Sequence, residues 1–251
     1  MTSGASATLT SSGVYYARST GAWILNSGTV AFTSFDHSGT AGLNLGGTGT
    51  KSVRNSTFYR NRYEMPDGSG GGQVYIGPYA TNATVEDNTI DGADWQTGYS
   101  NINNCYPPQW PNTVPQAVYG IEVETGSVNN YLYSNDVKRN TGAGININSA
   151  SGLTISGYLL SQCGYCYPRY VHDNTGYNPP FGNATDGIWF VGASQGISLN
   201  GILSRYNTGH SVSVWPGTGG YGWLGNHCLL PTYTTSMAFV YPYPLSTTTC
   251  P

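Results

Sequence analysis

The segment Val53-Arg-Asn-Ser-Thr-Phe58 decides the fold, because its pattern recurs along the chain. The pattern is an apolar residue, one residue, a turn-forming dipeptide, one residue and a second apolar residue. The other copies read Val85-Glu-Asp-Asn-Thr-Ile90, Leu132-Tyr-Ser-Asn-Asp-Val137, Thr154-Ile-Ser-Gly-Tyr-Leu159, Ser198-Leu-Asn-Gly-Ile-Leu203 and Trp223-Leu-Gly-Asn-His-Cys228. Every central dipeptide contains Asn or Gly, which tolerate a left-handed backbone at a tight bend.

The last apolar position of the pattern gives the period of the repeat. It is occupied by Phe35, Phe58, Ile90, Val137, Leu159, Leu203 and Cys228. The short intervals define a basic coil of about 22–25 residues, and the long intervals add insertions. A second marker lengthens with the first, and it consists of strands that begin at Leu43, Val74, Ile121, Ile145, Ile188 and Val212. All insertions are therefore expected after the first marker and before the second, at the same corner of each coil.

Short strands, Asn/Gly turns and a period near 23 residues predict an all-β solenoid, in which each coil stacks on the one before. The coils resemble those of the pectin-lyase-like superfamily of right-handed parallel β-helices, and Asn88 and Asn135 are placed like its stacked asparagine ladder. We expect a single domain over 1–251 with about seven coils: a lead-in at 1–20, coils at 21–230 and a cap at 231–251. The resemblance covers about residues 21–230 and leaves the activity open, since that superfamily contains lyases, glycoside hydrolases, epimerases, tailspikes and adhesins.

Composition limits the classes of partner. Charged residues make up 8% of the chain and the formal net charge is −3, so the basic surface that a nucleic acid would require is missing. No apolar run is long enough for a membrane span. Aromatic residues reach 13%, and their presence with a regular repeat argues against disorder.

The five cysteines indicate an oxidising compartment and a secreted or cell-surface protein. We expect one disulfide between Cys105 and either Cys163 or Cys166, and another between Cys228 and Cys250. The Cys163-Gly-Tyr-Cys166 spacing is also that of zinc or redox sites, but nothing around it has the pattern of a redox βαβ unit.

The strands of the second marker alternate inward and outward residues, so the outward residues form two columns. The first predicted column is Asn44, Tyr75, Glu122, Asn146, Trp189 and Ser213, and the second is Gly46, Gly77, Glu124, Asn148, Val191 and Trp215. Acids, amides and aromatic rings on one face suit a sugar, because rings stack on pyranose faces and polar groups bind hydroxyls. Insertions at 94–118 and 164–186 are expected to overhang this face and to contribute Trp110, Arg169 and His172. They could equally cover only an edge of the helix.

Glu122 and Glu124 are the candidate catalytic pair. Their Cα atoms should lie roughly 6.7 Å apart, which permits the carboxyl separation of an inverting glycosidase. Two other interpretations stay open: a Ca²⁺ site, which Asp186 could complete, or carboxylates that only solvate the surface. Asp91 and Asp94 have the same ambiguity. No other cofactor or metal is predicted.

The predicted function is that of an extracellular protein that hydrolyses or cleaves a polysaccharide in this groove. A lyase acting on uronates needs a basic residue or metal beside the substrate carboxylate, and the groove contains no Lys or Arg. A neutral glycan is therefore favoured over a polyuronate. The alternative is a non-catalytic glycan-binding or structural surface protein, such as a tailspike, adhesin or filament subunit. The sequence leaves the oligomeric state open.

Overall fold

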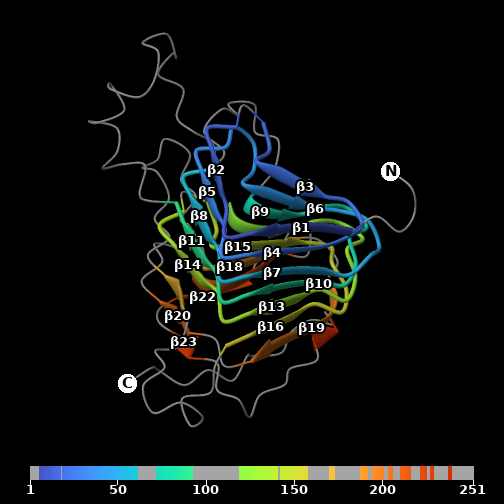
Figure 1. Cartoon of the computed structure of the whole chain (residues 1–251). Coiled ribbons are helices and arrows are strands. Elements are labelled where there is room, and N and C mark those ends of the chain that lie inside the picture. Colours follow the sequence, from blue (N-terminus) through green and yellow to red (C-terminus); the bar gives the residue numbers. More distant parts are fainter. Residues whose placement is uncertain are drawn as a thin grey trace, which may run out of the picture.

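The computed structural model describes residues 6–17, 19–61, 72–92, 119–140, 142–157, 170–172, 187–191, 194–200, 203–205, 210–215, 221–224, 227–228 and 237–238. Within these residues the chain forms 24 strands and no helix. The strands make three eight-stranded sheets, here called A, B and C, which run along the stack of coils (Figure 1).

Each sheet takes every third strand of the chain. Sheet A contains β1 (Ser6–Thr10), β4 (Ser27–Ala31), β7 (Lys51–Arg54), β10 (Ala83–Glu86), β13 (Tyr131–Tyr133), β16 (Thr154–Ser156), β19 (Gln195–Asn200) and β24 (Met237–Ala238). Sheet B contains β2 (Gly13–Tyr15), β5 (Ser34–Asp36), β8 (Thr57–Tyr59), β11 (Thr89–Asp91), β14 (Asp136–Lys138), β17 (Tyr170–His172), β20 (Leu203–Arg205) and β23 (His227–Cys228). Sheet C contains β3 (Ala22–Ile24), β6 (Leu43–Leu45), β9 (Gly72–Ile76), β12 (Tyr119–Val123), β15 (Ile145–Asn148), β18 (Ile188–Val191), β21 (His210–Trp215) and β22 (Tyr221–Leu224).

Strands β1 to β21 form seven coils, and each coil contributes one strand to each sheet. All pairings between neighbouring coils are parallel, as in Val30↔Val53, Phe35↔Phe58 and Leu43↔Val74. The predicted parallel β-helix of about seven coils is confirmed.

Inward side chains stack from coil to coil to make a continuous core. Phe35 and Phe58 are fully buried and stack with ring centroids 4.9 Å apart and an interplanar angle of 2°. The second marker holds along the whole of sheet C, because its six residues pair successively in register. The core therefore consists of stacks in which an inward apolar residue recurs at the same position of successive coils.

Buried amides connect the coils at the corners, as the sequence predicted for Asn88 and Asn135. Asn88 donates from its backbone N–H and its Nδ2 to Asn135 Oδ1, at 3.2 Å and 3.0 Å. Ser56 N–H donates in turn to Asn88 Oδ1 at 2.9 Å. These bonds satisfy corner amides that strand pairing leaves without partners.

A second ladder of amide side chains lies at the corner between sheets B and C. In one coil of this ladder a glycine stands in place of an amide residue, which the sequence did not reveal. Gly92 carries no amide here, since a Cβ atom would collide with the backbone of Arg139 and Asn140. Gln73 spans the gap: its Oε1 accepts from Asn61 Nδ2 at 3.4 Å, and its Nε2 donates to Asn140 Oδ1 at 2.8 Å. One long side chain thus links coils three and five.

Lys51 is a buried cation at the corner between sheets C and A. Its Nζ donates to the carbonyl oxygens of Gly47, Gly49 and Thr81 at 2.7, 2.6 and 2.9 Å. Burial lowers the pKa of Lys51 from its ordinary value of 10.5, because desolvation disfavours the charged form.

The sixth coil departs from the predicted corner pattern. Val171, not Leu159, pairs with Val137, so the first marker is wrong at this coil. Leu203 pairs with Tyr170, one residue out of the expected register. The predicted insertion at 164–186 is interrupted by β17, a strand of sheet B. The extra residues of this coil therefore divide between two corners, one on each side of β17. The Ser-Gly turn signal placed the sheet B strand of this coil near Leu159, but Tyr170-Val-His172 forms that strand.

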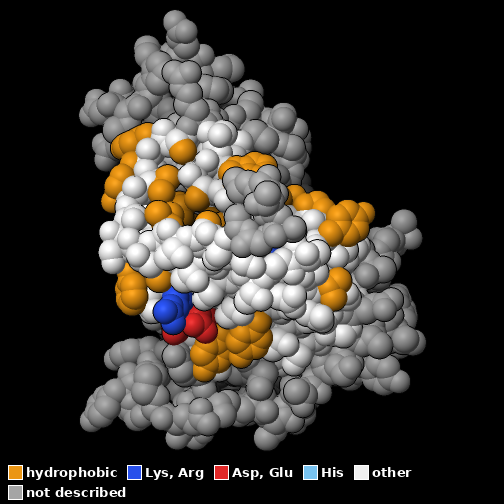
Figure 2. Space-filling model, turned by 45° about the vertical axis from the view of Figure 1, so that its right-hand side comes forward, with side chains coloured by type: hydrophobic (Ala, Val, Ile, Leu, Met, Phe, Trp, Pro, Cys, Tyr) orange, Lys and Arg blue, Asp and Glu red, His pale blue; other side chains and the backbone are white. Residues whose placement is uncertain are grey.

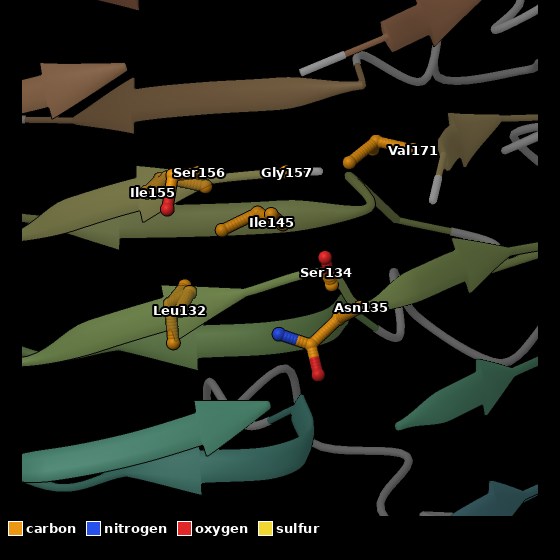
Figure 3. Close-up of a pocket in the computed structure, with 8 residues that line it drawn as sticks. All are labelled: Leu132, Ser134, Asn135, Ile145, Ile155, Ser156, Gly157 and Val171. Carbon is orange, nitrogen blue, oxygen red and sulfur yellow. The ribbon is translucent and has the colours of Figure 1, made fainter. Parts of the chain in front are cut away.

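The interior also contains a small cavity between the fifth and sixth coils (Figure 3). Its volume is about 20 Å³, room for about one water molecule. Apolar side chains of Leu132, Ile145, Ile155 and Val171 line most of it. It lies inside the helix, so we assign it to packing.

The ends of the β-helix differ from the predicted boundaries. The first coil begins at Ser6, inside the expected lead-in, and Val14 pairs with Phe35 as a regular core position. The Ser11-Ser12 turn contains neither Asn nor Gly, which is why the pattern missed this coil. Strands β22, β23 and β24 then pair antiparallel with the last strands of sheets C, B and A. The reversal starts at Tyr221, before the predicted cap at 231–251.

Candidate functional site: the outer face of sheet C

The outward residues of sheet C form the two predicted columns. In the first column Asn44 pairs with Tyr75, Tyr75 with Glu122, Glu122 with Asn146, and Asn146 with Trp189. Trp189 pairs in turn with Ser213. Trp23 extends this column into the first coil and is 58% exposed, which the sequence analysis missed because its second marker began only at Leu43.

Each acid of the candidate pair is joined to an amide of the next coil. Asn146 Nδ2 donates to Glu122 Oε1, and Asn148 Nδ2 donates to Glu124 Oε2, both at 3.3 Å. We call these the two acid–amide rungs. The backbone N–H of Thr125 also donates to Glu124 Oε2, at 3.1 Å. Amides that donate to both carboxyl groups fix the direction in which the acids point.

The two acids lie in different surroundings. Glu122 is 2% exposed and Asn146 is 5% exposed, although both belong to the outward column. Glu124 and Asn148 are half-buried. Buried polar residues on the outer face of a sheet are unusual, because burial removes the solvation of groups that could have stayed in water.

Aromatic rings flank the rungs on both sides. Tyr75, in the coil before Glu122, lies beside Gly77: a Cβ atom at Gly77 would be 3.3 Å from the Tyr75 ring. Trp189, in the coil after Asn146, lies with its ring centroid 6.2 Å from that of Tyr119, at an angle of 57°.

Tyr119 is a further member of the face that the alternation pattern did not indicate. The following residue, Gly120, occupies an inward position where a Cβ atom would collide with Val137. Gly120 and Ile121 donate their backbone N–H groups to the successive carbonyls of Ala143 and Gly144, at 3.2 Å and 3.0 Å. This irregularity shifts the alternation by one residue. A Gly at the start of the strand was the available signal.

Several predicted site residues are not brought into this arrangement. His172 lies on β17 in sheet B, paired with Lys138 and Arg205, so its predicted position on a loop over sheet C is wrong. Trp215 belongs to sheet C and pairs with Val191, as expected. Trp110 and Arg169 lie outside the described residues, as do Cys105, Cys163, Cys166 and Cys250 of the predicted disulfides.

The structure bears on two other interpretations of the acidic residues, a functional role for Asp91 and a metal site. Asp91 lies on sheet B, where it accepts from Arg139 Nε at 2.8 Å and forms an ion pair with the same guanidinium, which gives it a structural role. The described residues contain no group of three or more His, Cys, Asp or Glu side chains that could hold a metal ion. Asp186 and Asp94 lie outside that part of the chain.

The surface carries little charge. Figure 2 shows a face on which the visible acidic and basic side chains gather almost entirely in one small area, among uncharged and hydrophobic groups. The described part of the chain contains no helix with the length and hydropathy that a membrane span requires.

Comparison with known proteins identifies the family. The family described as "Right handed beta helix region" matches residues 1–218, and the chain belongs to this family. The fold is therefore a right-handed parallel β-helix, an architecture typical of carbohydrate-active proteins. No curated protein and no solved structure matches the chain.

Proposed function

We propose that the protein binds a neutral polysaccharide along the outer face of sheet C and hydrolyses it with Glu122 and Glu124. The two acid–amide rungs between the rings of Tyr75 and Trp189 are the observation that supports this most strongly. These rings lie three coils apart, which corresponds to about 14 Å at strand spacing. An oligosaccharide of several units spans that length.

The contrast between the two acids supports a division of roles. Burial penalises the charged form of a carboxyl group, so the surroundings of Glu122 suit a proton donor to the leaving oxygen. Glu124 is half-buried, beside the exposed Thr125, and accepts hydrogen bonds from Thr125 N–H and Asn148 Nδ2. It suits the base that activates water. Pairs of carboxyl groups in unlike environments are the usual arrangement in glycosidases.

The absence of positive charge supports a neutral substrate. In strands β3, β6, β9, β12, β15 and β18, the outward residues that the structure describes include no Lys, Arg or His. A polyuronate would bring a carboxylate beside Glu122 and Glu124 with no cation to offset the repulsion.

The test is a screen of xylan, mannan, mixed-linkage glucan and polygalacturonate for new reducing ends and for unsaturated products. We expect reducing ends from a neutral polysaccharide, without unsaturated products. Unsaturated products from polygalacturonate would contradict the proposal, because they require β-elimination on a uronate.

A second candidate is a glycan-binding surface without catalysis, as in a tailspike, adhesin or filament subunit. One observation favours it: the acid–amide rungs resemble the Asn88–Asn135 ladder of the interior, where hydrogen bonds between coils are structural. Binding of a polysaccharide without release of reducing ends would favour this candidate.

Both candidates place the protein outside the cell, either secreted or on the cell surface, where polysaccharides are encountered. The five cysteines of the sequence support this location, because disulfides form in oxidising compartments. Fractionation of the native host, followed by detection of the protein in the medium or on the surface, tests it; recovery only from the cytosol would contradict it.

A further inference from the structure

Two polar atoms on neighbouring coils of sheet C have an unused hydrogen-bonding capacity. Asn146 Oδ1 and Trp189 Nε1 are both shielded from solvent, and neither has a hydrogen-bond partner among the described residues. Asn146 and Trp189 are paired in register, so the acceptor and the donor belong to neighbouring residues of one column.

The orientation of the Asn146 amide is fixed by its neighbour. Its Nδ2 donates to Glu122 Oε1 at 3.3 Å. This hydrogen bond directs the amide nitrogen towards Glu122 Oε1 and the amide oxygen away from it. The indole Nε1 of Trp189 can only donate.

Among the described residues, the other buried amides have both ends satisfied. Asn130 Oδ1 accepts from Ala83 N–H at 2.9 Å and its Nδ2 donates to Ala80 O at 3.2 Å. Asn61 Oδ1 accepts from Ser38 N–H at 3.1 Å and its Nδ2 donates to Phe35 O at 3.1 Å. Buried polar atoms without partners destabilise a fold, and in native proteins they call for a functional explanation. The exception at Asn146 therefore points to a ligand group.

We propose that Asn146 Oδ1 and Trp189 Nε1 together bind one hydroxyl group of the substrate; this inference rests on the proposed glycan function. The hydroxyl donates its hydrogen to Asn146 Oδ1 and accepts from Trp189 Nε1–H. A carboxylate has no hydrogen to donate to the amide, and neither does a methyl ether. The subsite therefore selects a sugar with a free hydroxyl at that position, and Asn146 connects that hydroxyl to Glu122.

The test compares Trp189→Phe with a control outside sheet C, Tyr15→Phe. Both changes keep an aromatic ring and remove one hydrogen-bond donor from it, but Tyr15 lies exposed on β2 of sheet B. Affinity for soluble xylan, mannan and mixed-linkage glucan is measured by retardation in gels that contain each polymer. We expect Trp189→Phe to weaken binding of the retained polymer about 3- to 10-fold, the loss of one neutral hydrogen bond. Tyr15→Phe should change it less than about twofold.

The outcomes separate this inference from the proposed function. If the wild-type protein binds a neutral polymer and both Phe variants bind equally well, the hydroxyl subsite is wrong and the glycan function stands. If the wild-type protein binds none of the three, both are wrong. The indole N–H signal of Trp189, assigned by its loss in Trp189→Phe, gives a measurement on the unchanged protein. It should shift when the retained polymer's oligosaccharide is added, and an unshifted signal at saturation would overturn the inference.

Discussion

The outer face of sheet A carries Thr29, Ser52, Thr84, Tyr131 and Thr154 in successive register, and all of them are half-buried. The outer face of sheet C carries Glu122 and Asn146 at corresponding positions of its own strands, and both are buried. In both sheets the strands of neighbouring coils pair in parallel, and most inward residues are apolar. The difference shows that stacking constrains the inward residues, whereas the outward residues are free to vary. Stacking of the inward residues does not account for the burial of Glu122 and Asn146, and this burial supports the proposed function.

The largest effect expected from this comparison is on turnover. Glu122→Gln should lower the hydrolysis rate at least about 100-fold, because the amide cannot donate the proton that a general acid supplies. Its matched control is Glu86→Gln, an acid on the outer face of sheet A, which should leave the rate unchanged. Production of reducing ends from the polysaccharide that the wild-type protein cleaves is the measurement. If Glu122→Gln retains full activity, Glu122 is not the general acid of the hydrolysis and the assignment of this pair is wrong.

The next effect is on stability, and it distinguishes amides inside the β-helix from amides on the outer face of sheet C. Asn88→Ala should lower the free energy of unfolding by about 2–3 kcal/mol, because Ser56 N–H and Val53 O lose their partners in the interior. Asn148→Ala, on the half-buried rung of sheet C, should cost less than about 1 kcal/mol. Denaturant unfolding followed by circular dichroism measures both. Equal losses would mean that the outer rungs are as structural as the inner ladder.

A smaller effect is expected for the aromatic contact. Trp189→Ala should weaken glycan binding by about 1–3 kcal/mol, the order of one ring's burial. Tyr133→Ala removes a ring from the outer face of sheet A, where no binding is proposed, and should leave affinity unchanged. Calorimetry with the retained oligosaccharide measures both variants. A comparable loss in Tyr133→Ala would move the binding face from sheet C to sheet A.

The smallest effect is the pH dependence of stability that we expect from Lys51, a buried cation on β7 of sheet A. Its pKa is lowered in the folded protein, so between that value and 10.5 the unfolded chain binds more protons than the folded one. The free energy of unfolding should therefore rise with pH in this window, by less than about 1.4 kcal/mol for each unit of pH. Lys51→Met should show a weaker dependence when unfolding is followed at several pH values from about 8 to about 10. Identical slopes would show that Lys51 does not titrate in this range.

The sequence predicted the fold in the parts where each coil repeats a simple physical requirement. Ile121, Ile145 and Ile188 fill the same inward position, so their spacing alone gave the register of sheet C. The prediction was wrong where residues outside the expected pattern made the same turn or filled the same core position. Ser11-Ser12 makes a turn without Asn or Gly, and Val171 fills the core position expected for Leu159.

The candidate site could be predicted only in part. Alternation placed Glu122 and Asn146 in one column, because alternation and register are properties of a strand. Their burial depends on what surrounds the column, and spacing carries no information about it. Tyr119 was missed because the irregularity at Gly120 shifts the alternation. His172 was misplaced because the sixth coil divides its extra residues between two corners.

The most direct test of the proposed binding face is a crystal structure of Glu122→Gln with the oligosaccharide of the polymer that the wild-type protein retains. The substitution should slow cleavage and preserve binding. We expect the sugar along the outer face of sheet C between Tyr75 and Trp189, with one hydroxyl between Asn146 Oδ1 and Trp189 Nε1. Sugar bound on sheet A, on sheet B or at an end of the β-helix, with sheet C unoccupied, would contradict the account.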